Sequence, residues 1–172
     1  PATQEPQLVV LSAKNAERLR ESLERLHRYL SHQQELAAHL RPSLGDLAYT
    51  LQVGREPFEE RVALVAHTKE ELSQKLGRLR SGERDLEGVF TGNGKSRGGV
   101  ADTLGEGEEA LAFTQALVRN GRLDKLAQLW TQGAELPWEQ LHAGQRRGGG
   151  PLPAHPVAGY RHWVAGGGMV GA

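Results

Sequence analysis

The chain has 172 residues, and its 21 Lys and Arg balance its 21 Asp and Glu, so the formal net charge at pH 7 is zero. This length fits one compact domain with appended segments, and a chain with no excess positive charge is not drawn to nucleic acid or to an anionic membrane. The absence of cysteine excludes disulfides, thiolate zinc sites, iron–sulfur clusters and cysteine nucleophiles.

Residues 1–7 have the composition of a linker. They lack the basic and apolar regions of a signal peptide, and no later stretch approaches the roughly 18 apolar residues that span a bilayer. The chain begins with Pro1 rather than methionine, which suggests a segment of a longer protein. We therefore expect a cytoplasmic segment that does not enter a membrane.

A strand followed by an amphipathic helix is predicted next. Residues 8–11 form a short apolar run, and Asn15 can cap the first free amides of a helix. Leucines then recur at three- and four-residue spacing up to about residue 34, which places them on one helical face: Leu19, Leu23, Leu26 and Leu30. Arg and Glu alternate on the other face, which indicates a solvated, charge-paired surface rather than a basic patch.

A second helix and a second strand are predicted between residues 43 and 67. Ser43 can cap a helix that Gly54 ends. Residues 61–67 are then an apolar run of strand length.

A third helix and a weaker third strand follow. Thr68 and Glu71 have the spacing of a capping box at the start of a helix that runs to Gly82. Residues 86–90 suit a strand that is weakened by a central glycine. Residues 8–91 are therefore predicted to form an α+β domain, in which a small three-stranded sheet packs against helices.

Residues 92–107 are predicted to be a flexible loop, because six of residues 91–107 are glycine. Gly92 to Ser96 partly matches the end of a phosphate-binding loop, but Val89 stands where that motif needs glycine and no helix start follows. A nucleotide-binding or enzymatic fragment built on this loop is the alternative interpretation.

Two helices are predicted in the segment 108–142, the first ended by Asn120 and Gly121 and the second by Gly133. Two helices this short cannot bury all their apolar side chains between themselves. Some must face the sheet, and any that remain outward would mark an interaction site. The residues that we assign to this partner surface are Leu117, Arg119, Arg122, Leu123, Lys125, Leu126, Trp130 and Trp138.

Residues 143–164 are predicted to form an extended strap, and residues 165–172 a glycine-rich linker. Closely spaced prolines in 151–156 keep the strap extended. A large aromatic in an extended segment usually anchors it to a surface. The residues that we assign to strap docking are Leu152, Pro156, Tyr160, Arg161 and Trp163.

No catalytic, metal or cofactor site is predicted. His27, His32 and His39 are five and seven residues apart, whereas two ligands on one helical face need a spacing of three or four. The sequence has no Gly-x-Ser-x-Gly nucleophile motif. Solvated surface histidines are the simpler interpretation.

Several segments resemble a known family. Residues 8–14, 47–56 and 60–66 are similar, in order and spacing, to the linker domain that follows ketosynthases in modular polyketide synthases. Residues 152–164 resemble the closing strap of that region, usually a Leu-Pro-x-Tyr-Pro-Phe segment that ends in Arg-Tyr-Trp. The residues that depart from the strap pattern are His155, Val157 and Gly159, whereas Arg161 and Trp163 keep the expected types.

The segments 121–130 and 133–141 are similar to the insert of synthases whose acyltransferase is a separate protein. The resemblance implies a non-catalytic docking region C-terminal to a covalently linked ketosynthase of a trans-acyltransferase polyketide synthase. Its implied role is to fix the position of the ketosynthase. Further partners that it suggests are a trans-acting acyltransferase and neighbouring synthase chains; a self-associating module of unrelated ancestry is a third interpretation.

Overall fold

The computed structural model describes residues 5–33, 37, 41–53, 57–83, 85–94 and 107–145. Along the chain the elements are β1 (Gln7–Ala13), α1 (Ala16–Ser31), α2 (Leu44–Val53), β2 (Glu60–Ala66), α3 (Lys69–Arg80), β3 (Val89–Asn93), α5 (Glu108–Arg119), α6 (Leu123–Thr131) and α7 (Trp138–Gln145). The strands form one sheet in the order β1-β2-β3, and both pairs are antiparallel. The predicted α+β fold with a three-stranded sheet is confirmed.

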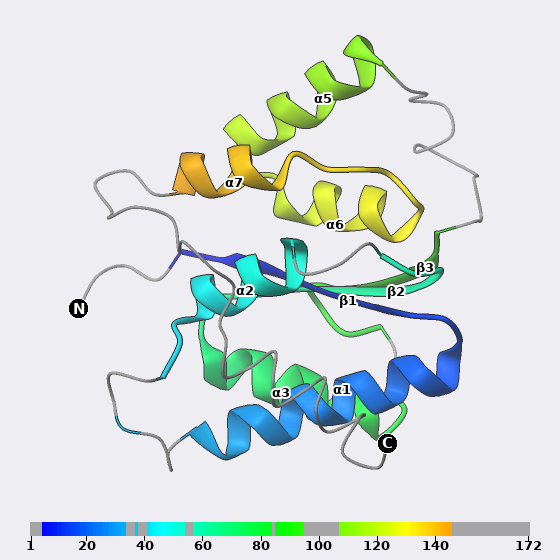
Figure 1. Ribbon diagram of the computed structural model, residues 1–172, viewed down its shortest axis with the longest axis vertical. Coiled ribbons are helices and arrows are strands. Elements are labelled where there is room, and N and C mark those ends of the chain that lie inside the picture. Colours follow the sequence, from blue (N-terminus) through cyan, green and yellow to red (C-terminus); the bar gives the residue numbers. More distant parts are fainter. Residues whose placement is uncertain are drawn as a thin grey trace.

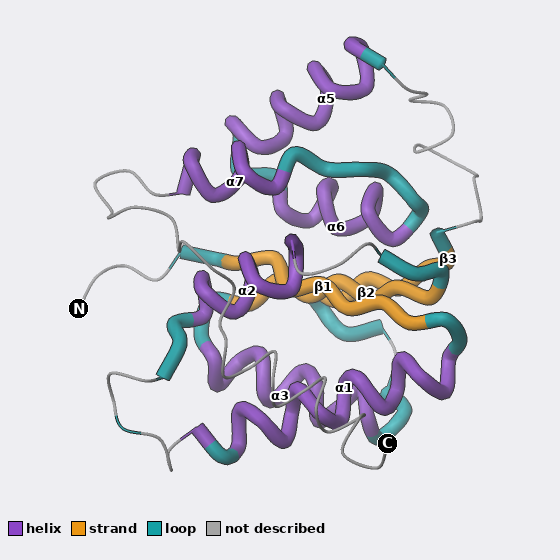
Figure 2. The backbone as a smooth tube through the Cα atoms, viewed as in Figure 1, coloured by secondary structure: helices purple, strands orange, loops and turns teal. Residues whose placement is uncertain are grey.

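Helices cover both faces of this sheet. Figure 1 shows α1 and α3 below it, α6 above it, α5 in a further layer beyond α6, and α7 between α5 and α2, while α2 runs beside β1. The tube view in Figure 2 shows the same layers, with the strands between two groups of helices. Because both faces are buried, β1 and β2 are apolar along nearly their whole length instead of alternating between apolar and polar residues.

The two faces belong to two separate core clusters. Val9 and Leu64 point into the first cluster, which α1, α2 and α3 complete. Leu8 and Ala63 point into the second, which the residues of α6 complete. All four of these strand side chains are fully buried, so successive residues of each strand serve opposite cores.

Three helix starts have the predicted caps. The Asn15 side chain accepts a hydrogen bond from the Arg18 amide at 2.9 Å. The Ser43 hydroxyl accepts one from the Asp46 amide at 3.1 Å, and the Thr68 hydroxyl accepts one from the Glu71 amide at 2.9 Å. These local signals fix where α1, α2 and α3 begin.

The third strand differs from its predicted bounds, 86–90. Gly88 has a φ of 75° and lies in the turn before β3, and the strand continues to Asn93. Gly92 and Asn93, which we expected in the loop, pair with Arg61 and Glu60 of β2. The Asn93 side-chain amide also donates to the Glu60 carboxylate at 2.8 Å, so β3 pairs with β2 from Leu64 to the first residue of β2, Glu60.

A further helix, α7, was not predicted. The Pro137 carbonyl accepts hydrogen bonds from the Gln140 and Leu141 amides at the start of this helix, and Leu141 is buried in the second core cluster. No helix within the described ranges is long and apolar enough to cross a bilayer.

Candidate interaction surface

The apolar members of the predicted partner surface lie mostly inside the protein. Leu126 is 1% exposed and Trp130 4%. Both belong to the second core cluster, together with Leu117 and Leu123, and Trp138 packs against that cluster while partly buried. Leu117, Leu123, Leu126 and Trp130 are buried in this second core, so in this structure they are not available at the surface.

The charged members of the predicted surface lie outside. Arg119, at the end of α5, and Lys125, on α6, are exposed. Arg122, between these helices, is also exposed, and its guanidinium lies 3.4 Å from the Asp124 carboxylate. The segment 108–142 therefore buries Leu117, Leu123 and Leu126 in the second core cluster and presents basic side chains to solvent.

Two large apolar side chains that we did not assign to the partner surface are exposed on α5. Leu111 is 47% exposed and Phe113 41%, and Ala112 between them is also exposed. We call these three residues the α5 patch. Residues 110–113 are four consecutive apolar positions, and because one helical face cannot bury all four, this run was the signal in the sequence.

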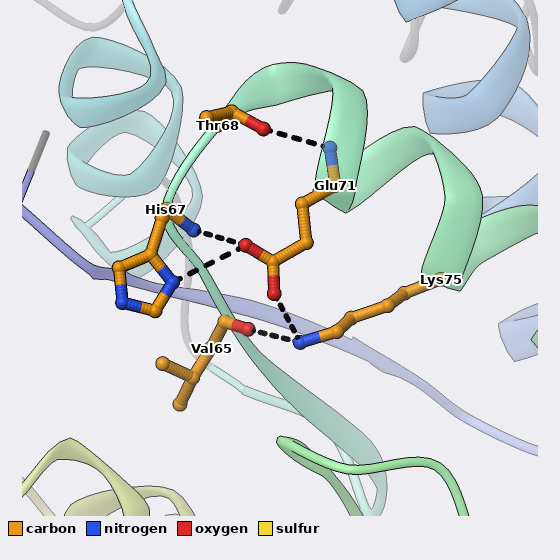
Figure 3. A network of polar contacts seen from close by, with 5 residues as sticks. All are labelled: Val65, His67, Thr68, Glu71 and Lys75. Atoms are coloured by element: carbon orange, nitrogen blue, oxygen red, sulfur yellow. Dashed lines mark hydrogen bonds and ion pairs between the residues drawn. The ribbon is translucent and has the colours of Figure 1, made fainter.

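A polar network closes the connection between β2 and α3 (Figure 3). One oxygen of the Glu71 carboxylate accepts from the His67 amide at 2.7 Å and lies 3.2 Å from the His67 ring. The other oxygen lies 2.9 Å from the Lys75 ammonium, which also donates to the Val65 carbonyl at 2.6 Å. The hydrogen bond from Lys75, followed by those from His67, lowers the pKa of Glu71 to about 2, against an opposing effect of burial. The carboxylate is occupied by neighbours in its own fold, so this arrangement is structural rather than that of a free acid or base.

The histidine and loop candidates form no chemical centre in the described part of the chain. His27 lies over Gly77 of α3, and burial, followed by the Arg80 charge, lowers the pKa of its ring. The described residues contain no group of three or more His, Asp or Glu that could hold a metal ion. Within the proposed nucleotide loop, Gly92 and Asn93 are in β3, while Lys95 and Ser96 lie outside the described residues.

The strap residues also lie outside the described part of the chain. They are Leu152, Pro156, Tyr160, Arg161 and Trp163, and their docking stays a prediction.

Comparison with known proteins identifies the sheet domain. Residues 10–83 match the model of the family described as "RhiE-like, KS-MAT linker domain". This segment belongs to that linker family. The chain is also 37% identical over 164 residues to polyketide synthase PksL, and 38% identical over 157 residues to polyketide synthase PksR, both from Bacillus subtilis strain 168. These matches cover 95% and 87% of this chain but only 4% and 6% of the two synthases.

Several solved ketosynthase structures contain a region similar to this chain. A ketosynthase from module 6 of the bacillaene synthase of Bacillus subtilis 168 matches 82% of this chain with a TM-score of 0.70 and 27% identity. A ketosynthase from module 1 of the bacillaene synthase of Bacillus amyloliquefaciens FZB42 matches 78% with a TM-score of 0.66 and 28% identity. The matched region spans 25% and 23% of those two chains. The predicted resemblance to the ketosynthase-flanking linker of polyketide synthases is confirmed.

Proposed function

We propose that this chain is a non-catalytic scaffold that follows a covalently linked ketosynthase and fixes its position in a polyketide synthase. The observation that carries the proposal is the combined match, in which the linker family covers residues 10–83 and ketosynthase structures cover most of the chain. A sheet with helices packed on both faces is suited to such a role, because close-packed cores are rigid and deform little under load.

The scaffold role is tested by expressing the parent ketosynthase with and without this chain attached. We expect the attached form to have the higher melting temperature, because the linker would cover apolar surface of the ketosynthase. Equal melting temperatures and equal solubility for the two forms would contradict the role.

The α5 patch is the proposed contact for a second protein. The resemblance of residues 121–130 and 133–141 to the insert of synthases with a separate acyltransferase supports assigning this chain to that kind of synthase. The candidate partners are then a free-standing acyltransferase and the same segment of a neighbouring synthase. Leu111 and Phe113 would supply the apolar contact, and the exposed basic side chains farther along the same segment, Arg119, Arg122 and Lys125, would supply charge.

A double variant, Leu111→Glu with Phe113→Glu, tests this contact. Calorimetric titration with the acyltransferase measures binding to that partner, and sedimentation analysis of the chain alone measures self-association. If the α5 patch is the contact, the double variant should weaken one of these two interactions. The matched control is Val53→Glu on α2, because Val53 is also a partly exposed apolar side chain, at 38%, on a different helix. If the double variant and the control bind and self-associate like the parent, the α5 patch is not a contact surface.

The non-catalytic assignment has its own test. Thermal unfolding should not shift on addition of ATP and Mg²⁺, since a ligand at about 100 times its dissociation constant stabilises a protein by roughly 2.7 kcal/mol. A reproducible rise of several degrees would instead support the nucleotide-binding interpretation of residues 92–96.

A further inference from the structure

Arg61 is a charged residue in the buried middle layer of the fold. It lies in β2 opposite Gly92 of β3 and is 9% exposed. Strand alternation places it in the same row as Ala63 and Val65, which pack in the second core cluster under α6. A guanidinium in such a row is costly to bury unless its donors are bonded.

The guanidinium is bonded to main-chain carbonyls on both sides. Its Nε donates to the Phe58 carbonyl at 2.8 Å, and its Nη1 donates to the Trp130 carbonyl at 2.9 Å. The guanidinium carbon also lies 4.9 Å from the centroid of the Trp130 ring, within the range of a cation–π contact. One side chain of the sheet thus contacts both the backbone and the ring of a residue in α6.

The position of the Trp130 carbonyl gives this contact a specific role. Trp130 lies in the last turn of α6, where carbonyls carry partial negative charge, and its carbonyl accepts both from the Gly133 amide at 3.0 Å and from Arg61. The last turn of α6 has no basic residue of its own. Arg61 therefore supplies, from the sheet, the positive charge that stabilises the end of this helix.

Glycines allow the two backbones to approach closely at the same place. A Cβ on Gly94 would lie 2.7 Å from the Arg61 Nε, and a Cβ on Gly92 would lie 2.7 Å from the Thr131 carbonyl oxygen. Gly133 lies against the Gly94 carbonyl with a φ of 107°, a conformation that favours glycine. The end of β3 and the end of α6 thus pack backbone to backbone around the guanidinium.

We propose that Arg61 is a lock that holds α5, α6 and α7 on the linker sheet in a single orientation. The α6 helix packs on the sheet, α5 packs against α6, and α7 packs against α5 and α2 (Figure 1). Fixing the end of α6 therefore fixes the direction in which the α5 patch faces relative to the linker domain. This role of Arg61 depends only on contacts within the chain, so it can be tested separately from the binding of any partner.

Hydrogen exchange of the full chain tests the lock. Replacing Arg61 by Met removes both hydrogen bonds and the charge but keeps an apolar side chain of similar length. A hydrogen bond from a charged group contributes enough free energy that α6 and β3 amides should exchange about tenfold faster or more. Amides of α1 and α3, which line the other core, should change less than about twofold, because their contacts are intact.

Two further variants keep the test decisive. Arg61→Lys retains the charge but not the planar fork, so it should accelerate α6 exchange less than Arg61→Met does, and it replaces Arg61→Met if that variant does not fold. The control is Leu76→Ala, because Leu76 is fully buried in the first core and its loss should accelerate α1 and α3 at least as much as α6. Residual dipolar couplings should show that α5 samples a wider range of orientations relative to β2 in the Arg61 variants, but not in the control. An unchanged rate for α6 in the variants of Arg61, or an equal acceleration of all elements, overturns the proposal.

Discussion

The ammonium of Lys75 lies 2.9 Å from a carboxylate oxygen of Glu71, one helical turn earlier on α3. The same ammonium donates to the Val65 carbonyl of β2 at 2.6 Å, and a Cβ on Gly88 would lie 2.8 Å from it. Lys75 thereby joins α3, β2 and the turn that precedes β3, and Glu71 joins this group to the end of β2 through His67 (Figure 3).

This network predicts a specific pH dependence of stability. The pKa of Glu71 falls from 4.5 to about 2 on folding, so its ionised form stabilises the fold above about pH 4.5, and that contribution is lost as the pH falls toward 2. Glu71→Gln should cost about 1 kcal/mol at pH 7, a value discounted because a third of the Glu71 side chain is exposed. Urea unfolding of parent and variant should show a gap that closes between pH 4.5 and 2. A gap of constant size across that range would mean that charge is not its source.

Two glycine substitutions should have opposite effects on stability, because Gly92 lies where β3 approaches α6 closely and Gly45 has room for a Cβ. Gly92→Ala should destabilise the protein by about 1–3 kcal/mol, because its Cβ would lie 2.7 Å from the Thr131 carbonyl oxygen. Gly45→Ala, on α2, should instead stabilise it by about 0.5–1 kcal/mol, because the atoms nearest to its Cβ are 3.8 Å away and alanine favours helix. Chemical unfolding of both variants measures the two effects. If Gly92→Ala is neutral, the backbones are not in contact as the structure has them.

Gln52 is predicted to protect the outer edge of the sheet. β1 is an edge strand, and the buried Gln52 side chain of α2 donates to the Leu8 carbonyl at 2.6 Å. Gln52→Leu should cost about 1–3 kcal/mol, because it leaves that buried carbonyl without this donor. Gln128→Leu, at an exposed position of α6, is the matched control and should change stability by less than about 0.5 kcal/mol. Equal unfolding free energies for the two variants would contradict this role.

Signals carried by a few neighbouring residues were enough to predict the first half of the fold. The caps at Asn15 and Thr68 and the apolar runs at 8–11 and 61–67 each report local structure, and the structure contains the elements they predicted. The end of β3 could not be predicted in this way. Gly92 lies in that strand because it pairs with Arg61, a contact between residues far apart in the sequence.

Sequence periodicity could not predict which side chains of the segment 108–142 are buried and which are exposed. A leucine stripe marks one face of a helix, but it does not say whether a sheet or a partner covers that face. Leu126 and Trp130 cover the second face of this chain's own sheet, while Leu111 remains partly exposed. The burial of Arg61 and its contacts with α6 could not be predicted either, because a charged residue at the start of a strand is expected to be exposed to solvent.

Charge reversal on the outer side of α5 and α6 should change association without changing stability. The variants are Arg119→Glu and Lys125→Glu, and because both side chains are exposed, each should alter the unfolding free energy by less than about 0.5 kcal/mol. Charges at the edge of an interface act mainly on the association rate and its salt dependence. Binding to the acyltransferase or to a second copy should therefore weaken or strengthen most at low salt, and the difference from the parent should shrink as salt is added.

The control for this prediction is Arg20→Glu, which makes the same change of charge at an exposed position of α1, on the opposite side of the sheet (Figure 1). It should leave association rates like those of the parent, because it lies far from the α5 patch. Surface plasmon resonance at several salt concentrations measures all three variants. If Arg20→Glu shifts the rates as much as Arg119→Glu and Lys125→Glu do, the effect comes from net charge alone, and the outer side of α5 and α6 is not the contact surface.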